Sequence, residues 1–162
     1  MQAESNVVEF PAKEKKKELR MSLVPSQEIG KYWHIVTPGL EQTISKSGNE
    51  TTLDYILDSL MAGTSWLWIG MSGIDYGGVM VTEVLSTNTG NWLNIPFAYS
   101  VPPSGRSSPD FGLTLECLKQ MEVFARSMKF QGIKFLSARK GFGRLAPKAG
   151  YTPRFVEYVK EF

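Results

Sequence analysis

Apolar residues recur along this chain at spacings that predict strands and helices in a definite order. Alternating or continuous apolar runs predict six strands, at residues 19–24, 65–71, 78–85, 92–101, 133–137 and 154–159. The middle three follow one another through short glycine-containing turns, so they are expected to pair antiparallel.

Helical spacing of apolar residues predicts four helical regions. The first spans residues 26–44, where Pro38 and Gly39 predict two pieces or a kink. The second covers residues 53–61 and ends near Gly63. The third begins at Pro109, and a short fourth covers residues 143–148. The apolar stripe of the third helix comprises Leu113, Cys117, Met121, Phe124 and Met128.

The resulting order, β-α-α-β-β-β-α-β-α-β, predicts an α/β (α+β) fold with a mixed, mostly antiparallel central sheet. With 162 residues, 42% of them hydrophobic, the chain is long enough for one domain with a substantial core, at residues 20–162. Residues 1–19 are polar and carry the run KEKKKE, so they are interpreted as a charged arm. Its candidate partner-binding residues are Lys13, Lys15, Lys16 and Lys17.

Positive charge is concentrated in the C-terminal third, although the net charge is only +2. Residues 126–162 hold nine Lys or Arg and two Glu, which suits phosphates, nucleic acid or an acidic protein surface. Only Phe142 and Tyr151 interleave the basic cluster, so nucleic-acid binding is not expected. Cys117 is the single cysteine, and no signal peptide or membrane-length apolar run occurs, which predicts an intracellular protein without a membrane anchor.

Several residues in the second predicted strand and in the segment that closes the domain resemble those of a known family. They are Trp66 and Trp68 in the second strand, and the closing pattern Arg139, Gly141, Phe142, Arg144, Leu145, Gly150 and Tyr151. Over about residues 20–162 the chain resembles the GNAT superfamily, the fold of acyl-CoA-dependent N-acetyltransferases. More closely, it resembles the GNAT-like proteins encoded by tailed bacteriophages.

The resemblance places an acyl-CoA pyrophosphate in the loop at residues 102–112, on backbone amides before the third helix. The matching candidates here are Ser104, Gly105, Arg106, Ser107 and Ser108, with Arg139 and Lys140 near the adenosine phosphates. The loop departs from the family's glycine spacing. Ser108 reads as the N-cap and Pro109 as the first helical residue, so Asp110 would complement the helix dipole and repel a pyrophosphate.

The resemblance also implies two catalytic groups. The general acid is usually a tyrosine, but the matching residue is Ala146, so Tyr99 or Tyr151 would have to replace it. The general base often lies on the third or fourth strand, where Glu83 is the only carboxylate. The alternative for Glu83 is a solvent-facing glutamate or one paired with a cross-strand basic residue.

Several other residues have structural interpretations. His34 has no metal-ligand partners at suitable spacing, so no metal site is expected, and Cys117 is interpreted as an inert core thiol. Trp66 and Trp68 alternate and are expected to pack on one face of a central strand. Arg144 and Lys148 are candidates for partner binding, against an ordinary solvated surface.

Two hypotheses from different classes follow. In the first, the chain is a phage protein with a degenerate acyl-CoA site that binds no cofactor and acts as a virion or assembly component. It would contact other virion proteins or its own copies through the arm and the basic C-terminal face, in the virion or the host cytoplasm. In the second, it is an acetyl-CoA-dependent N-acetyltransferase. A regulator or inhibitor of host machinery is a third possibility.

Overall fold

The computed structural model describes residues 18–48, 50–102, 111–137, 141–155 and 157–162. Within these ranges a five-stranded sheet has the order β1-β2-β3-β4-β5, antiparallel throughout except for the parallel pair β4 and β5. The strands are β1 Arg20–Val24, β2 Ser65–Ser72, β3 Asp75–Thr87, β4 Gly90–Ser100 and β5 Ile133–Phe135. The helices are α1 Ile29–Lys46, α2 Leu53–Met61, α3 Phe111–Ser127 and α4 Phe142–Leu145, with short 3-10 turns at Ser26–Glu28 and Pro147–Ala149.

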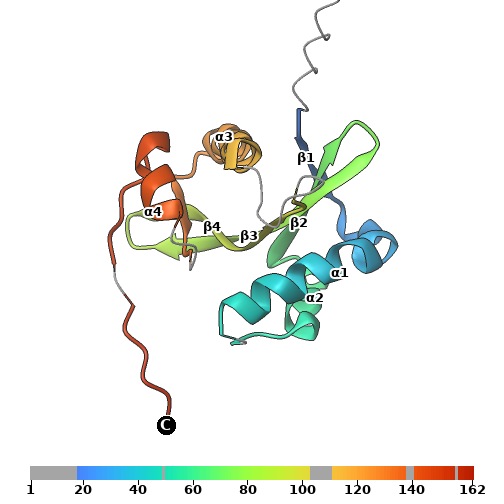
Figure 1. The fold of residues 1–162 in the computed structure, drawn as a ribbon, viewed down its shortest axis with the longest axis horizontal. Helices are drawn as coiled ribbons and strands as arrows, with labels where there is room; N and C mark the ends of the chain where they lie inside the picture. Colours follow the sequence, from blue (N-terminus) through green and yellow to red (C-terminus); the bar gives the residue numbers. More distant parts are fainter. Residues whose placement is uncertain (1–17, 49, 103–110, 138–140, 156) are drawn as a thin grey trace, which may run out of the picture.

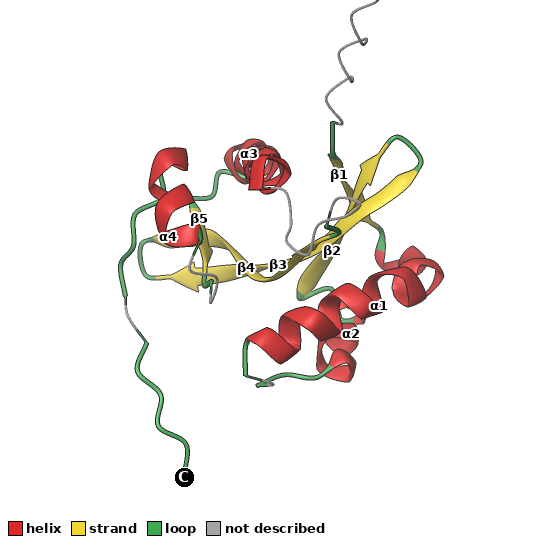
Figure 2. Cartoon of the chain, viewed as in Figure 1, coloured by secondary structure: helices red, strands yellow, loops and turns green. Residues whose placement is uncertain are grey.

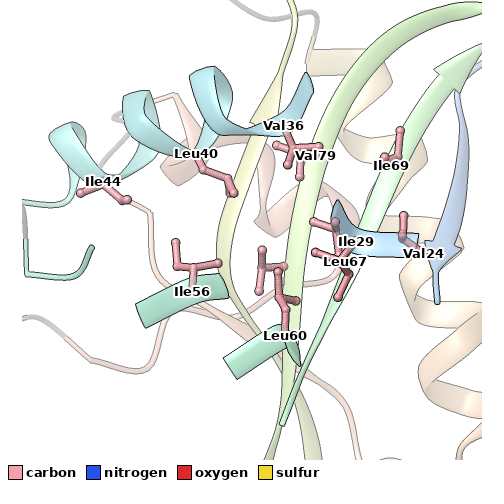
Figure 3. Packing of buried hydrophobic residues seen from close by; sticks show 11 residues of the cluster. Val24, Ile29, Val36, Leu40, Ile44, Ile56, Leu60, Leu67, Ile69 and Val79 are labelled. Carbon is pink, nitrogen blue, oxygen red and sulfur yellow. The ribbon is translucent and has the colours of Figure 1, made fainter. Parts of the chain in front are cut away.

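Helices cover both faces of the sheet, as Figure 1 shows: α1 and α2 lie on one face, and α3 and α4 on the other. The same two layers are visible by element type in Figure 2. In the core under α1 and α2, side chains from both helices face the strands, and Leu40, Ile56 and Leu67 of β2 belong to one buried cluster (Figure 3). Thr52 caps α2 by accepting a hydrogen bond from the backbone N–H of Tyr55 at 3.2 Å.

Helix α1 is one continuous helix, so the expectation of two helical pieces is wrong. Pro38 lies inside it and lacks the N–H that would bond to the carbonyl of His34. The Thr37 hydroxyl donates instead to the carbonyls of Trp33 at 3.0 Å and of His34 at 3.4 Å. The Thr37 hydroxyl therefore gives the His34 carbonyl a hydrogen-bond donor in place of the N–H that Pro38 lacks.

The tryptophans of β2 pack as the alternation predicted. Trp66 and Trp68 both meet Phe124 of α3 edge to face, with ring centroids 5.6 and 4.8 Å apart. Cys117 is buried in the same core, and burial raises the pKa of its thiol from 9.0 to about 11, with Glu116 adding to the rise. Cys117 is therefore a protonated core thiol at neutral pH, as predicted. Met128 does not belong to this core: it follows α3 and is 48% exposed.

The sixth strand is a wrong prediction. Residues 152–155 and 157–162 form no strand, and Phe155 and Tyr158 are each 90% exposed. Strand β5 is also shorter than expected, with three residues. A strand is stabilised by pairing, and an edge of three residues provides few backbone partners, so an alternating apolar pattern alone does not order this segment.

A buried hydrogen bond inside the sheet leads to a stability prediction. The indole Nε1–H of Trp68 donates to the Thr82 hydroxyl at 2.9 Å, and Thr82 is fully buried. Thr82→Val keeps the shape but leaves the indole N–H unpaired, which is expected to cost about 1–3 kcal/mol in a urea unfolding titration. Thr64→Val removes an exposed hydroxyl hydrogen bond and is expected to change stability by less than about 0.5 kcal/mol. Equal effects of the two substitutions would contradict a role for the buried bond.

Candidate functional site

Among the residues that the structure describes, strand β4 has an unpaired edge over its second half, which is called its free edge below. It pairs with β5 only at Leu93, Asn94 and Ile95, and from there to Ser100 its ladder partner is β3. The N–H of Val101 donates to the Gly77 carbonyl at 2.8 Å, so the backbone groups of Ala98 and Ser100 are directed away from β3. The Ala98 carbonyl accepts from Thr43 of α1 at 3.4 Å. The other outward groups of these two residues have no hydrogen-bond partner in the described part of the chain.

A β-bulge in the pairing of β4 with β3 lies next to the point where β4 and β5 part. Val81 pairs with Phe97 and Glu83 pairs with Asn94, so Ile95 and Pro96 together oppose the single residue between them. Pro96 lacks an N–H, and a bulge is a position where the ladder tolerates this. The bulge shifts the alternation of β4, so that Asn94 lies on the same face of the sheet as Phe97 beyond it.

The centre of the candidate site is a row of polar residues across three strands, namely Glu83 of β3, Asn94 of β4 and Lys134 of β5. The Asn94 side-chain amide donates to Glu83 Oε1 at 2.7 Å, which holds the carboxylate beside the point where β4 and β5 part. All three side chains are half-buried. They lie on the face that carries α1 and α2, beyond the Val81 and Phe97 positions that pack under those helices.

Trp92 lies beside this row on β4, two residues before Asn94. It pairs with Leu85, and its ring lies over Gly132, where an added Cβ would be 2.7 Å from Cζ3 of the indole. Lys134 Nζ is 4.5 Å from the ring centroid and the Arg154 guanidinium carbon is 5.5 Å from it. Two cationic side chains therefore meet at one aromatic ring.

Of the predicted catalytic candidates, only Glu83 belongs to this row. The structure gives its Oε1 an amide partner, Asn94, and leaves the side chain half-buried. Tyr99 packs its ring against Gly39 of α1. The Tyr151 hydroxyl donates to Glu122 of α3 at 3.1 Å, and its ring meets Phe135 edge to face at 5.1 Å. Burial, and then Glu122, raise the pKa of Tyr151 well above its usual range, which makes its hydroxyl a weaker acid.

Most of the predicted cofactor- and partner-binding residues lie outside the described residues. These are Lys13, Lys15, Lys16, Lys17, Ser104, Gly105, Arg106, Ser107, Ser108, Arg139 and Lys140. Arg144 of α4 and Lys148 are exposed. No helix in the described ranges is long and apolar enough to cross a membrane. The same ranges contain no group of three potential metal-ligating side chains.

Sequence reasoning missed the residues that surround Glu83. Asn94, Trp92 and Lys134 were placed within predicted strands, and no function was proposed for them. One signal was available, because a polar residue inside the predicted strand at 92–101 falls opposite Glu83 once the two strands are paired through their turn. Tyr76 was missed too: its hydroxyl is buried without a hydrogen-bond partner in the described structure, and burial raises its pKa.

Solved acetyltransferases share this fold. A predicted acetyltransferase from Clostridium acetobutylicum, solved with acetyl-CoA, has a TM-score of 0.60 and 17% identity, covering 87% of this chain and 96% of its own. An aminoglycoside acetyltransferase from an uncultured soil metagenomic sample, in complex with sisomicin, has a TM-score of 0.62 and 9% identity, covering 89% and 96%. A GNAT family acetyltransferase from Staphylococcus aureus has a TM-score of 0.57 and 12% identity, covering 90% and 99%.

No protein-family model matches the sequence, and no curated protein matches it. The structural similarity nevertheless extends over nearly the whole of each of these chains. The protein therefore has the α+β fold of the GNAT acetyltransferases, as the element order predicted. At these identities the similarity establishes the fold and leaves the activity to be argued from the site.

Proposed function

We propose that the protein is an acyl-CoA-dependent N-acyltransferase with Glu83 as its general base. The observation that carries this proposal is the Glu83–Asn94 pair, which lies where β4 leaves β5. It offers a carboxylate beside a free strand edge, on a fold whose solved examples include an acetyltransferase with acetyl-CoA. This is the second of the two hypotheses from the sequence, and it accounts for more of the geometry than the first.

The free edge of β4 fits the cofactor that the fold implies. The pantetheine arm of acyl-CoA is an extended chain with two amide groups, and such a chain can pair with an unpaired strand edge as a peptide does. The backbone groups of Ala98 and Ser100 would hold it. When bound, the cofactor supplies an acyl group activated as a thioester. Residues Ser104 to Ser108 remain the predicted pyrophosphate contacts.

Glu83 would take the proton from the acceptor amine. An amine is mostly protonated near neutral pH and must lose a proton before its nitrogen can attack a thioester carbonyl. Oε1 of Glu83 is engaged by Asn94, and the described chain places no hydrogen-bond partner on Oε2. Asn94 thus fixes the orientation of the carboxylate while one oxygen stays available for the amine.

The alanine at position 146 is compatible with this chemistry. A thiol has a pKa of about 8.5, so a thiolate leaves readily near neutral pH without a dedicated proton donor. Loss of the general acid is therefore expected to slow transfer without preventing it. Proton transfer by a positioned acid typically contributes about 10²–10⁴-fold to a rate.

The test is acyl-CoA-dependent release of thiol, followed with a thiol-reactive chromophore, across a panel of primary amines. We expect thiol release that requires both acetyl-CoA and an amine, with the acetylated amine detected by mass spectrometry in equal amount. Thiol release at the uncatalysed rate for every amine and for longer acyl-CoA esters would contradict the proposal.

The Tyr151→Phe variant tests whether Tyr151 acts as the general acid or only as a structural hydrogen-bond donor to Glu122. Because its hydroxyl is bound to Glu122 and its pKa is raised, we expect kcat to change by less than about threefold, whereas removal of a working general acid costs about 10²–10⁴-fold. Stability is expected to fall by about 1 kcal/mol through loss of the hydrogen bond. A hundredfold loss of kcat with unchanged stability would identify Tyr151 as the acid after all.

A non-catalytic role in a phage virion or its assembly is the second candidate. Two observations favour it: Ala146 cannot donate a proton, and the Tyr151 hydroxyl is held by Glu122. The phage relationship predicted from Trp66, Trp68 and the closing arginine and glycine pattern belongs to this candidate. Deleting residues 1–19 should then impair assembly into particles, measured by mass photometry. Normal assembly of the truncated protein would contradict a docking role for the arm.

A further inference from the structure

We infer that the acceptor of this site is a primary amine that carries a carboxylate several bonds from its nitrogen, as an ω-amino acid does. This inference rests on the proposed function and names its substrate class. Its basis is the charge distribution along the polar row, which has a carboxylate at Glu83 and two cations at the other end, Lys134 and Arg154.

The two cations have no anionic partner among the described residues. Lys134 and Arg154 each contact the Trp92 ring, and no ion pair of either is found in the described chain. Like charges that gather at one ring repel each other, and a bound anion would relieve this repulsion. Arginine also presents a fork of N–H donors that matches a carboxylate in a bidentate arrangement. The end of the row near Trp92 is therefore suited to a carboxylate.

The platform beneath these cations is fixed by packing. The absence of a side chain at Gly132 allows the Trp92 ring to lie over the start of β5. The neighbouring Gln131 amide donates to the Thr89 carbonyl, which ties the turn between β3 and β4 to the segment before β5. Lys134 thus projects from a strand that is paired with β4, and it lies beside the Trp92 ring. Trp92 and Lys134 are therefore placed by paired strands, and Arg154 reaches the ring from the irregular segment that follows Gly150.

The register of the three strands predicts how far apart the amine and the carboxylate of the acceptor must be. Glu83, Asn94 and Lys134 lie opposite one another on three adjacent strands, so two interstrand spacings of about 4.8 Å place the Glu83 and Lys134 backbones roughly 10 Å apart. Glu83 is held against Asn94, whereas Lys134 Nζ lies over Trp92, so the two charges stay apart. An amine bound to Glu83 and a carboxylate bound to Lys134 and Arg154 would be separated by about five to seven bonds, which excludes α-amino acids as the matching class.

The experiment compares 6-aminohexanoate with 6-aminohexanamide, two acceptors of equal length that differ in one charge. With acetyl-CoA we expect kcat/KM for thiol release to be roughly tenfold higher for the carboxylate, because only this compound can form ion pairs with the two partly exposed cations. Lys134→Met and Arg154→Met should each remove much of this preference. Lys119→Met removes the same charge from an exposed position on α3 and should leave the preference unchanged.

A binding measurement keeps this inference separate from the proposed function. Quenching of Trp92 fluorescence is followed during titration with each of the two compounds, with Trp92→Phe as the reference for the other tryptophans. Tighter binding of 6-aminohexanoate that is lost in Lys134→Met supports the inference, even if no thiol is released and the acyltransferase proposal fails. Equal rates and equal binding for the two compounds would overturn it.

Discussion

Replacing Glu83 by glutamine is expected to lower kcat/KM for acyl transfer by about 10²–10⁴-fold, the usual contribution of a positioned general base. Glutamine has nearly the same shape and keeps a carbonyl oxygen that can accept the hydrogen bond from Asn94. The substitution therefore removes the proton acceptor and leaves the sheet intact. Steady-state thiol release and a urea unfolding titration, made on the same preparation, measure the two effects separately.

The pH dependence gives an internal check on this result. Without a base in the site, transfer depends on the fraction of acceptor already deprotonated, which rises tenfold per pH unit below an amine pKa of about 10.4. The difference in kcat/KM between the wild type and Glu83→Gln should therefore become smaller as the pH rises. Glu116→Gln removes a carboxylate from an exposed position on α3, and it should match the wild type at every pH. An unchanged rate for Glu83→Gln at neutral pH would exclude Glu83 as the base.

Gly39→Ala is expected to destabilise the fold, although alanine is the better helix former. Gly39 is buried in α1 against β4, and a Cβ there would lie 2.4 Å from Cδ1 and 2.9 Å from Cγ of Tyr99. The gain in helix propensity is about 1 kcal/mol, while overpacking of a well-packed core costs about 1–3 kcal/mol. We expect the cost of the clash to exceed the gain in helix propensity, with a net loss of stability of up to about 2 kcal/mol in a urea unfolding titration.

Gly30→Ala is the matched control, because it lies in the same helix with no atom within 4 Å of an added Cβ. That variant should be more stable than the wild type by up to about 1 kcal/mol. In a Tyr99→Ala background the clash of Gly39→Ala should largely disappear, which would give a coupling energy of about 1–3 kcal/mol. If Gly39→Ala is as stable as Gly30→Ala, close packing of α1 on β4 is not what requires this glycine.

Local signals in the sequence predicted much of this fold. The apolar spacing of residues 53–61 and the Thr52 cap define α2 without any distant contact. The alternation of Trp66 and Trp68 placed both rings on one face of β2, where they meet Phe124. Such features depend on side-chain periodicity and helix capping, which are determined by residues close together in the sequence.

The candidate site was harder to predict because it depends on register. Glu83 is a site residue through its partner Asn94, and that pairing appears only when the two strands are aligned through the turn at Thr87–Gly90, because neither residue stands out within its own strand. The failed strand at residues 154–159 has the same cause, because an alternating pattern is a strand only where an edge can pair with it. Pro38 and Gly39 predicted two helical pieces or a kink. The compensating hydrogen bond of the Thr37 hydroxyl could not be predicted, because it forms only once the helix itself is formed.

The measurement that tests the central claim most directly is backbone amide hydrogen exchange with and without acetyl-CoA, resolved to single residues by NMR. If acyl-CoA pairs with the free edge of β4, the amides of Ala98 and Ser100 should exchange at least about tenfold more slowly in its presence, because both then gain a partner. The β3 amides, which are already paired, should change much less. Unchanged exchange at Ala98 and Ser100 in millimolar acetyl-CoA would contradict the proposed acyl-CoA site.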